Sequence, residues 1–390
     1  MSSESKQLRY RLQQTGKAEF LNIPVKERLK FLDRGIVLNP DGSFSGNKEP
    51  FHFIYSQSFS REMIYYLCSL AEAIRKFHHR KGKDGAIWLK TLLPHKRTVG
   101  LFSQESSRTE TSFQAAAQTL GMDVLVKNLS TSSQKKGESW ADTIATFSSY
   151  ADALFIRHSE PLRLEEAAWV SNQSEDRIPI INAGSGPTDK PDMYQHPTQM
   201  LLDVYTLWRS FEEHGGIENR IFAYCGDMNA RVVRSLIYAS RHFPPKKIYL
   251  VCPPGRKLKP DMTDFLDRRK FLYEYRDSLG DIIDQAEVVY MVRIQDEYDT
   301  DGSPKKQPLA DNYKLKWEYR DRMPKHARVL HALPKRDEID PEYDCADDPF
   351  NQFVYKTYQM CNGVWMRAAI FAYLFKVAEN ILSKSKEQYS

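Results

Sequence analysis

Short apolar runs rich in β-branched residues alternate along the chain with longer stretches in which apolar residues recur every three or four positions. The first pattern is typical of buried strands, and the second is typical of helices packed on one face. Their alternation predicts an α/β fold of mainly parallel sheets flanked by helices. The predicted strands fall into two groups: residues 98–102, 123–126, 153–156 and 178–181, followed by 221–225, 247–251, 271–275, 288–292 and 328–331.

Two groups of strands predict two domains, and a chain of 390 residues exceeds the usual limit for a single core. We place the first domain at residues 51–205 and the second at residues 206–350, with a helix over 196–211 joining them. Residues 1–50 are rich in charge and turn residues, so we interpret them as an N-terminal extension.

The composition narrows the class of protein. A hydrophobic content of 41% and a charged content of 27% are ordinary for a globular chain. The five cysteines are scattered without a C-x-x-C pair, which favours reduced thiols in a cytoplasmic protein over disulfides or zinc ligands. No apolar run reaches membrane-spanning length. The net charge of +5 comes from basic residues dispersed among acids, which argues against a nucleic-acid partner, and no motif indicates a metal or cofactor.

Two predicted helix starts carry polar groups suited to an anion. Residues 106–109, Ser-Ser-Arg-Thr, follow a predicted strand and open a helix. The first turn of a helix presents N–H groups and the positive end of its dipole, and hydroxyls with a guanidinium complete a cage for phosphate. His196 opens the second helix, with Gln199 one turn along. Taken singly, the first segment is more typical of an ordinary helix cap, and His196 is more typical of a core or capping residue.

Two arginines in the second half of the chain suit a ligand with two carboxylates. Arg231 follows the Gly226-Asp227 turn, while Arg293 and Gln295 lie two residues apart at a strand end, so both can project to one side. A guanidinium can hold a carboxylate through two parallel hydrogen bonds. Surface ion pairs are the alternative role for either arginine considered alone.

These segments belong to a longer set that occurs in a fixed order. The set is Ser106-Ser107-Arg108-Thr109, Lys135-Lys136-Gly137-Glu138 with Asp142-Thr143, Arg157-His158, His196-Pro197-Thr198-Gln199, Arg231, Met291-Val292-Arg293-Ile294-Gln295 and His331-Ala332-Leu333-Pro334. In order and spacing it resembles the aspartate/ornithine carbamoyltransferase family, and within it the catalytic chains that use aspartate. The similarity runs from about residue 51 to residue 382.

The resemblance implies transfer of the carbamoyl group from carbamoyl phosphate to the amine of L-aspartate, giving N-carbamoyl-L-aspartate and phosphate, a reaction of pyrimidine biosynthesis. The implied mechanism is direct attack of the amine on the carbonyl carbon, with phosphate leaving and no covalent nucleophile. The resemblance also implies a final helix over 364–382 that completes the first domain, and a cis bond between Leu333 and Pro334.

The resemblance further implies a role for each motif residue. The residues implied to bind carbamoyl phosphate are Ser106, Ser107, Arg108, Thr109, Ser132, Lys136, Arg157, His196, Gln199 and Leu333. Those implied to bind aspartate are Lys136, Arg231, Arg293, Gln295 and Pro334. The implied catalytic residues are Arg108, Thr109, Lys136, Arg157 and His196. In the family the loop with Ser132 and Lys136 reaches into the neighbouring chain's site, which implies a homotrimer with shared active sites.

The chemistry of the donor side chains agrees with these roles. Arg157, His196 and Thr109 suit the carbonyl oxygen, where negative charge develops during the attack. Gln199 can accept a hydrogen bond from the carbamoyl NH2 group.

Among several departures from the family pattern, two bear on the choice of acceptor. Ala332 stands where the aspartate enzymes usually have Pro, and Val232 stands where Thr is usual. A carbamoyltransferase for another amino-acid acceptor, such as an ornithine-like one, therefore stays open, although the S-M-G signature of the ornithine enzymes is missing. A non-catalytic regulatory paralogue also stays open, and no motif identifies a regulatory subunit or a role for residues 1–50 and 187–194.

Overall fold

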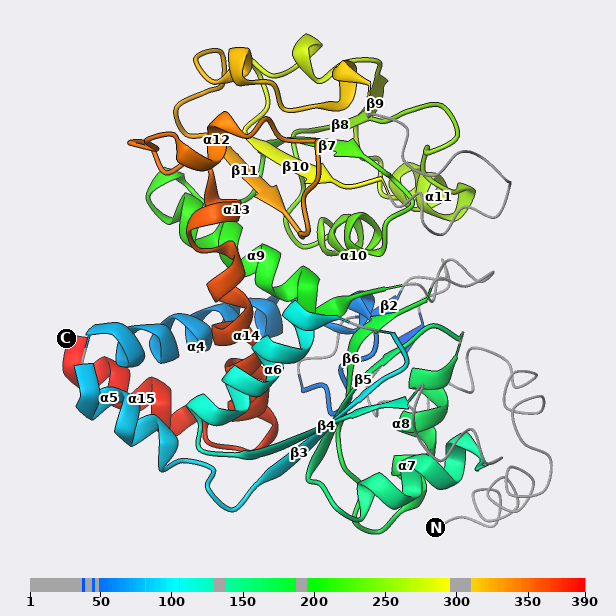
Figure 1. Cartoon of the computed structure of the whole chain (residues 1–390), viewed down its shortest axis with the longest axis vertical. Coiled ribbons are helices and arrows are strands. Elements are labelled where there is room, and N and C mark those ends of the chain that lie inside the picture. The colour runs from blue at the N-terminus through cyan, green and yellow to red at the C-terminus, as the bar shows by residue number, and fades with distance from the viewer. Residues whose placement is uncertain are drawn as a thin grey trace. The chain divides into compact units, whose positions relative to one another are not determined.

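The computed structural model describes residues 37–38, 44–45, 49–80, 82–104, 106–129, 138–160, 162–186, 195–294 and 310–389. The chain divides into two compact units, Met1–Thr198 with Val364–Ser390, and Gln199–Gly363. Each unit contains one parallel sheet flanked by helices, so the predicted α/β fold is confirmed (Figure 1).

The sheet of the first unit has four parallel strands in the order β4-β3-β5-β6. These strands are β3 (Arg97–Phe102), β4 (Asp123–Asn128), β5 (Ala153–His158) and β6 (Ile180–Ser185). All four overlap predicted strands. The order reverses between β3 and β5, because β4 adds to one side of this pair and β6 to the other. Open α/β sheets bind ligands at the carboxyl ends of the strands beside such a reversal.

Side chains on β5 alternate between two covered faces, as a sheet buried on both sides requires. Leu154 and Ile156 join a core cluster that includes Ile144. Phe155 points the other way and stacks on Phe113, with 4.4 Å between ring centroids. The helices of this unit are α4 (Arg61–Arg80), α5 (Gly82–Lys90), α6 (Ser107–Thr119), α7 (Trp140–Ser148), α8 (Arg163–Gln173) and α15 (Ala378–Tyr389).

The sheet of the second unit has five parallel strands in the order β11-β10-β7-β8-β9, so its reversal lies between β7 and β10. The strands are β7 (Ile221–Gly226), β8 (Lys247–Val251), β9 (Tyr273–Arg276), β10 (Val288–Val292) and β11 (Arg328–His331). The helices that complete the structure are α9 (Pro197–Phe211), α10 (Arg231–Ala239), α11 (Pro260–Arg268), α12 (Glu342–Cys345), α13 (Val354–Thr357) and α14 (Gln359–Leu374). An antiparallel pair, β1 (Val37–Leu38) and β2 (Phe44–Ser45), stands apart from both sheets.

The two faces of this second sheet have different neighbours. Val289 and Met291 of β10 belong to a large apolar cluster that includes Ile282 and Leu315. Tyr290, between them on the strand, contacts α9 instead, where its hydroxyl bonds to a buried carboxylate.

The C-terminal segment differs from the prediction. We expected one helix over residues 364–382, and this expectation is wrong, because the chain forms α14 and α15 with a break between them. Lys376 adopts a left-handed backbone with a φ of 62°. The N–H groups of Lys376 and Val377 donate to the carbonyls of Tyr373 and Ala372, which is the hydrogen-bond pattern of a Schellman helix end. Apolar residues keep their helical spacing across this break, so the sequence pattern did not indicate it.

Candidate active-site residues

The predicted phosphate segment lies at the carboxyl end of β3, where α6 begins at Ser107. Ser106 occupies the N-cap position, but its side chain makes no capping hydrogen bond. Neither the Ser106 nor the Ser107 hydroxyl forms a hydrogen bond with any residue in the described part of the chain. The two serine hydroxyls therefore do not cap the helix, which is the ordinary role of such residues at a helix start. Thr109 is buried, whereas Arg108 is exposed.

Two further predicted residues lie at the same edge of this sheet. Arg157 pairs in register with Phe102 at the end of β3, on the strand across the reversal. His196 follows Gln195, whose carbonyl accepts the N–H of Ser185 at the end of β6 at 2.9 Å. Both Arg157 and His196 are buried. The fold therefore gathers residues 106–109, Arg157 and His196 along the carboxyl edge of the first sheet, where open α/β sheets bind their ligands.

In the second unit, the predicted arginines flank the reversal between β7 and β10. Gly226 and Val292 end these strands and pair in register. Arg231 opens α10 after β7, and Arg293 directly follows β10. Both side chains are partly buried. Parallel strands end at one edge, so the topology brings these two sequence-distant guanidinium groups to the same part of the sheet.

A short turn holds the start of α10 in place. The carboxylate of Asp227 accepts the N–H of Asn229 at 2.9 Å and forms an ion pair with Arg256 at 3.4 Å. The carbonyl of Arg256 accepts the N–H of Met228 at 3.1 Å. These contacts tie the Gly226-Asp227 turn to the loop after β8, and so position the helix that begins with Arg231.

The segment after β11 contains the predicted cis bond between Leu333 and Pro334, which is confirmed. Leu333 has a φ of 55°, an unusual value for a residue other than glycine. His331 supports this backbone, since its Nδ1 accepts the N–H of Leu333 at 2.7 Å and its Nε2 lies 2.6 Å from a carboxylate oxygen of Glu338. His331 and Glu338 are both buried. Three other predicted residues, Ser132, Lys136 and Gln295, lie outside the described residues.

The sequence reasoning missed a buried polar cluster on α9. Asp203, Thr206 and Ser210 are buried although α9 carries mostly apolar residues. Asp203 accepts hydrogen bonds from Gln199, Tyr290 and Gln359. A signal was present in the sequence, because polar residues recur at positions 199, 203, 206 and 210 with helical spacing. A polar stripe within an apolar helix requires partners elsewhere in the fold.

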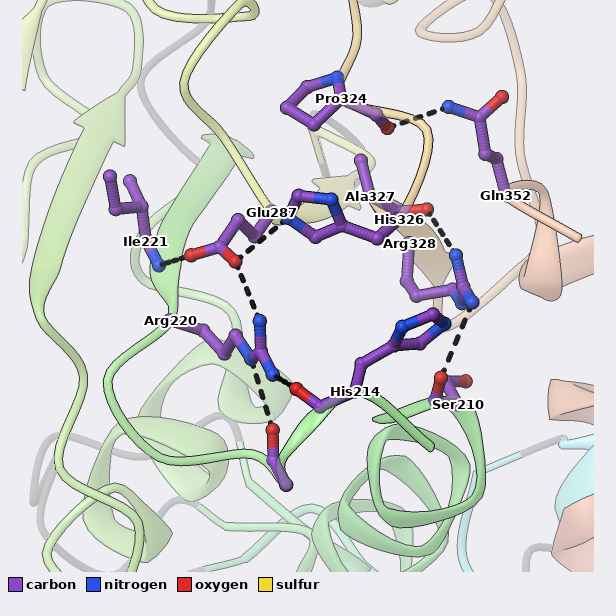
Figure 2. Close-up of polar contacts among 11 residues, drawn as sticks. Ser210, His214, Arg220, Ile221, Glu287, Pro324, His326, Ala327, Arg328 and Gln352 are labelled. Carbon is purple, nitrogen blue, oxygen red and sulfur yellow. Dashed lines mark hydrogen bonds and ion pairs between the residues drawn. The ribbon is translucent and has the colours of Figure 1, made fainter. Parts of the chain in front are cut away.

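A cavity of about 400 Å³ lies at the opposite edge of the second sheet, at the amino ends of β7, β10 and β11. Its lining residues are His214, Arg220, Lys325, His326, Arg328 and Phe350. Figure 2 shows that protein groups bind both of its arginines. Arg220 contacts Glu287 at 2.8 Å and the carbonyl of His214, and Arg328 donates to the carbonyl of Ala327 at 3.0 Å. These contacts join the starts of neighbouring strands, away from the predicted substrate residues.

Comparison with known proteins places the chain in a family. Residues 52–209 match the carbamoyl-P binding domain of aspartate/ornithine carbamoyltransferase, and residues 218–374 match the Asp/Orn binding domain. Aspartate carbamoyltransferase 1, chloroplastic, from Pisum sativum is 34% identical over 324 residues, which are 82% of this chain and 78% of the relative. The chain belongs to the aspartate/ornithine carbamoyltransferase family.

Other members of the family are similar over most of their length. The aspartate carbamoyltransferase catalytic subunit of Methanocaldococcus jannaschii is 36% identical over 287 residues, covering 73% of this chain and 87% of the relative. A structure of the M. jannaschii catalytic subunit superimposes with a TM-score of 0.69 at 33% identity, covering 85% of this chain and 98% of that one. Aspartate transcarbamoylase from Trypanosoma cruzi, in complex with carbamoyl phosphate and aspartate, gives a TM-score of 0.68 at 29% identity, with coverage of 86% and 98%.

Proposed function

We propose that this carbamoyltransferase-family chain transfers the carbamoyl group of carbamoyl phosphate to the amine of L-aspartate, giving N-carbamoyl-L-aspartate and phosphate. This is a step of pyrimidine biosynthesis. The observation that carries the proposal is the pair of sheet reversals, one beside a helix start with groups suited to phosphate and the other beside two arginines. The aspartate enzymes among the relatives support the choice of acceptor.

The first unit supplies groups for the donor substrate. The helix start at 106–109 offers backbone N–H groups, two serine hydroxyls and the Arg108 guanidinium to the phosphate. Arg157, His196 and Thr109 stabilise the carbonyl oxygen as it becomes negative. The hydroxyl of Thr198 lies 3.4 Å from Nδ1 of His196. When the Thr198 hydroxyl donates this hydrogen bond, Nδ1 accepts it and the proton of the neutral imidazole is on Nε2. Nε2 then donates to the substrate.

The second unit supplies groups for the acceptor. Arg231 binds the α-carboxylate of aspartate, and Arg293 with Gln295 binds the β-carboxylate. Leu333 binds carbamoyl phosphate and Pro334 binds aspartate. Asparagine has a neutral amide in place of the β-carboxylate and would leave the Arg293 guanidinium without a carboxylate. Ornithine has a cationic side chain that Arg293 would repel, so the site selects aspartate over both.

The reaction needs no covalent nucleophile. The amine nitrogen attacks the carbonyl carbon, a C–N bond forms, and the C–O bond to phosphate breaks. The departing phosphate takes the amine proton, which balances the reaction without a side-chain base. Positioning of the two substrates and electrostatic stabilisation of the carbonyl oxygen then supply the rate enhancement.

The assembly and the cell compartment are parts of the same proposal. Ser132 and Lys136 of one chain complete the site of its neighbour in a homotrimer. The protein acts in the cytoplasm, although the relatives from plants are named as chloroplastic. Within the described part of the chain, none of the helices is long and apolar enough to cross a membrane.

The test is a screen of amine acceptors with carbamoyl phosphate, in which phosphate release is measured. We expect aspartate to react far faster than asparagine or ornithine, and we expect Arg293→Ala to reduce this preference while leaving carbamoyl phosphate affinity unchanged. Ornithine reacting as fast as aspartate would assign the chain to a different acceptor class. Folded protein that releases no phosphate with any amine would indicate a non-catalytic paralogue.

A further inference from the structure

Buried groups of the second unit hold the side-chain amide of Gln199. Its Nε2 donates to Oδ1 of Asp203, one turn along α9, at 3.1 Å. A second hydrogen bond joins Gln199 to the hydroxyl of Tyr290. Tyr290 itself donates to Oδ2 of Asp203 at 2.7 Å. Asp203 and Tyr290 are both fully buried. Three side chains therefore form a closed triangle that fixes the position of the amide.

The chemistry of the two partners decides which end of the amide they hold. A carboxylate only accepts hydrogen bonds, so Asp203 selects the NH2 end of Gln199. Burial, reinforced by Asp203, raises the pKa of Tyr290 well above its usual value of 10, so its hydroxyl keeps its proton. That single proton is directed to Asp203, and toward Gln199 the hydroxyl oxygen acts as an acceptor. Both partners therefore bind the nitrogen of the amide.

The oxygen of the same amide is left for a ligand. No hydrogen bond to Oε1 of Gln199 is formed by any residue in the described part of the chain. Gln199 is also partly exposed, unlike Asp203 and Tyr290. An acceptor oxygen at this position matches a ligand NH2 group, which has hydrogen atoms to donate.

Asp203 is anchored from another side by a residue that reaches the cis turn. Nε2 of Gln359 donates to Oδ1 of Asp203 at 2.7 Å, and its Oε1 accepts the N–H of His331 at 2.9 Å. His331 in turn accepts the N–H of Leu333. One buried network thus connects Gln199 with Leu333, the two residues of this unit that the sequence assigns to carbamoyl phosphate.

We infer that Asp203 and Tyr290 are positioning residues that orient the Gln199 amide so that its oxygen, and not its nitrogen, meets the NH2 group of carbamoyl phosphate. The inference rests on the proposed function and extends it to the selection of the donor substrate. Acetyl phosphate has the same phosphate and carbonyl groups but carries a methyl group in place of NH2. A fixed acceptor oxygen distinguishes the two, whereas an amide free to turn would present either end.

The test compares the affinities of carbamoyl phosphate and acetyl phosphate by calorimetric titration of the full-length protein without aspartate. Tyr290→Phe removes one acceptor for the Gln199 nitrogen, and Asp203→Asn replaces the other with an amide. The matched control is Tyr224→Phe, because Tyr224 pairs with Tyr290 on the adjacent strand and is equally buried. Tyr224 has no hydrogen bond to Gln199.

We expect the preference for carbamoyl over acetyl phosphate to fall about three- to tenfold in Tyr290→Phe and Asp203→Asn. This ratio of affinities corresponds to the net free energy of one hydrogen bond. The preference should keep its wild-type value in Tyr224→Phe, and the affinity for inorganic phosphate should be unchanged in all variants. If Asp203→Asn fails to fold, the conservative Tyr290→Phe change still decides the question.

Two results would overturn the inference. One is a wild-type protein that binds both acyl phosphates equally, and the other is a Tyr290→Phe variant in which both affinities fall by the same factor, as general loosening of the core would produce. Since aspartate is omitted, a wrong acceptor assignment leaves this measurement intact. A failed acceptor screen together with a preserved donor preference would therefore reject the proposed reaction and keep the inference.

Discussion

Replacing Gly226 with alanine tests whether the junction between β7 and β10 positions both arginines assigned to aspartate. Gly226 has a φ of 122°, and a Cβ atom built on it lies 1.8 Å from the carbonyl oxygen of Val292. Ordinary van der Waals contact begins at 3.4 Å, so the two strand ends would have to separate by about 1.6 Å. The atom that must move belongs to the backbone, which cannot turn aside as a flexible side chain could.

This displacement falls directly on the proposed aspartate site. Val292 precedes Arg293, and Gly226 ends the strand that leads into the turn before Arg231. A misplacement of about 1 Å can cost roughly 10²-fold in rate. We therefore expect kcat/KM for aspartate to fall about 100-fold in Gly226→Ala. Phosphate binding, assigned to the first unit, should stay close to the wild-type value.

Gly255→Ala provides the matched control. Gly255 belongs to the same unit and also has a positive φ, 83°, but nothing lies within 4 Å of an added Cβ. This variant carries the left-handed backbone strain, about 1–2 kcal/mol, without the clash. Steady-state kinetics with aspartate, calorimetric titration with phosphate and urea unfolding separate the two effects. A kcat/KM for Gly226→Ala equal to that of Gly255→Ala would refute the steric reasoning.

Three other predictions concern charge, assembly and pH. Arg108→Ala should lower turnover at least about tenfold, because a charged hydrogen bond is worth about 1.5–3 kcal/mol; near-normal turnover at saturating carbamoyl phosphate would contradict the phosphate assignment. Inactive Arg108→Ala and Lys136→Ala chains, mixed and reassembled, should recover about a quarter of wild-type activity, since about three quarters of random trimers are hybrids with one intact site in three. No recovery despite subunit exchange would mean that Lys136 does not complete a neighbour's site. Burial lowers the pKa of His52 from 6.5 to about 4, so between these pH values the unfolded chain binds the proton that the folded chain excludes. Stability should therefore fall by about 2 kcal/mol from pH 7 to pH 5 relative to His52→Gln in urea unfolding, and equal pH dependence in both proteins would show that His52 does not titrate in this way.

The positions of most strands were predictable because a parallel strand is buried on both faces and must be apolar along its whole length. The predicted runs 247–251 and 288–292 coincide with β8 and β10. The run 271–275 is displaced from β9, Tyr273–Arg276. This strand lies at the edge of its sheet and its side chains are only partly buried, so burial imposes a weaker pattern on its sequence.

The sequence also determined where the residues proposed to bind the substrates lie in the two sheets. An arginine or serine at the start of a helix after a strand lies at the carboxyl edge of a parallel sheet, wherever that strand stands in the sheet. Local order along the chain therefore placed residues 106–109, Arg231 and Arg293 at these edges, and the family resemblance supplied their proposed roles. It did not show that the Ser106 side chain makes no capping hydrogen bond, because the same residue type serves either role.

Only the tertiary structure decided how the Gln199 amide is oriented. Asp203 and Tyr290 are 87 residues apart in the chain, and Gln359 lies 156 residues from Asp203. In the sequence, Tyr290 is one more large residue in an apolar strand, and the spacing of Gln199 and Asp203 is compatible with a solvated helix face. These residues become hydrogen-bond partners when β10 packs against α9. Burial there removes water as a partner, so each polar group must form its hydrogen bond within the protein.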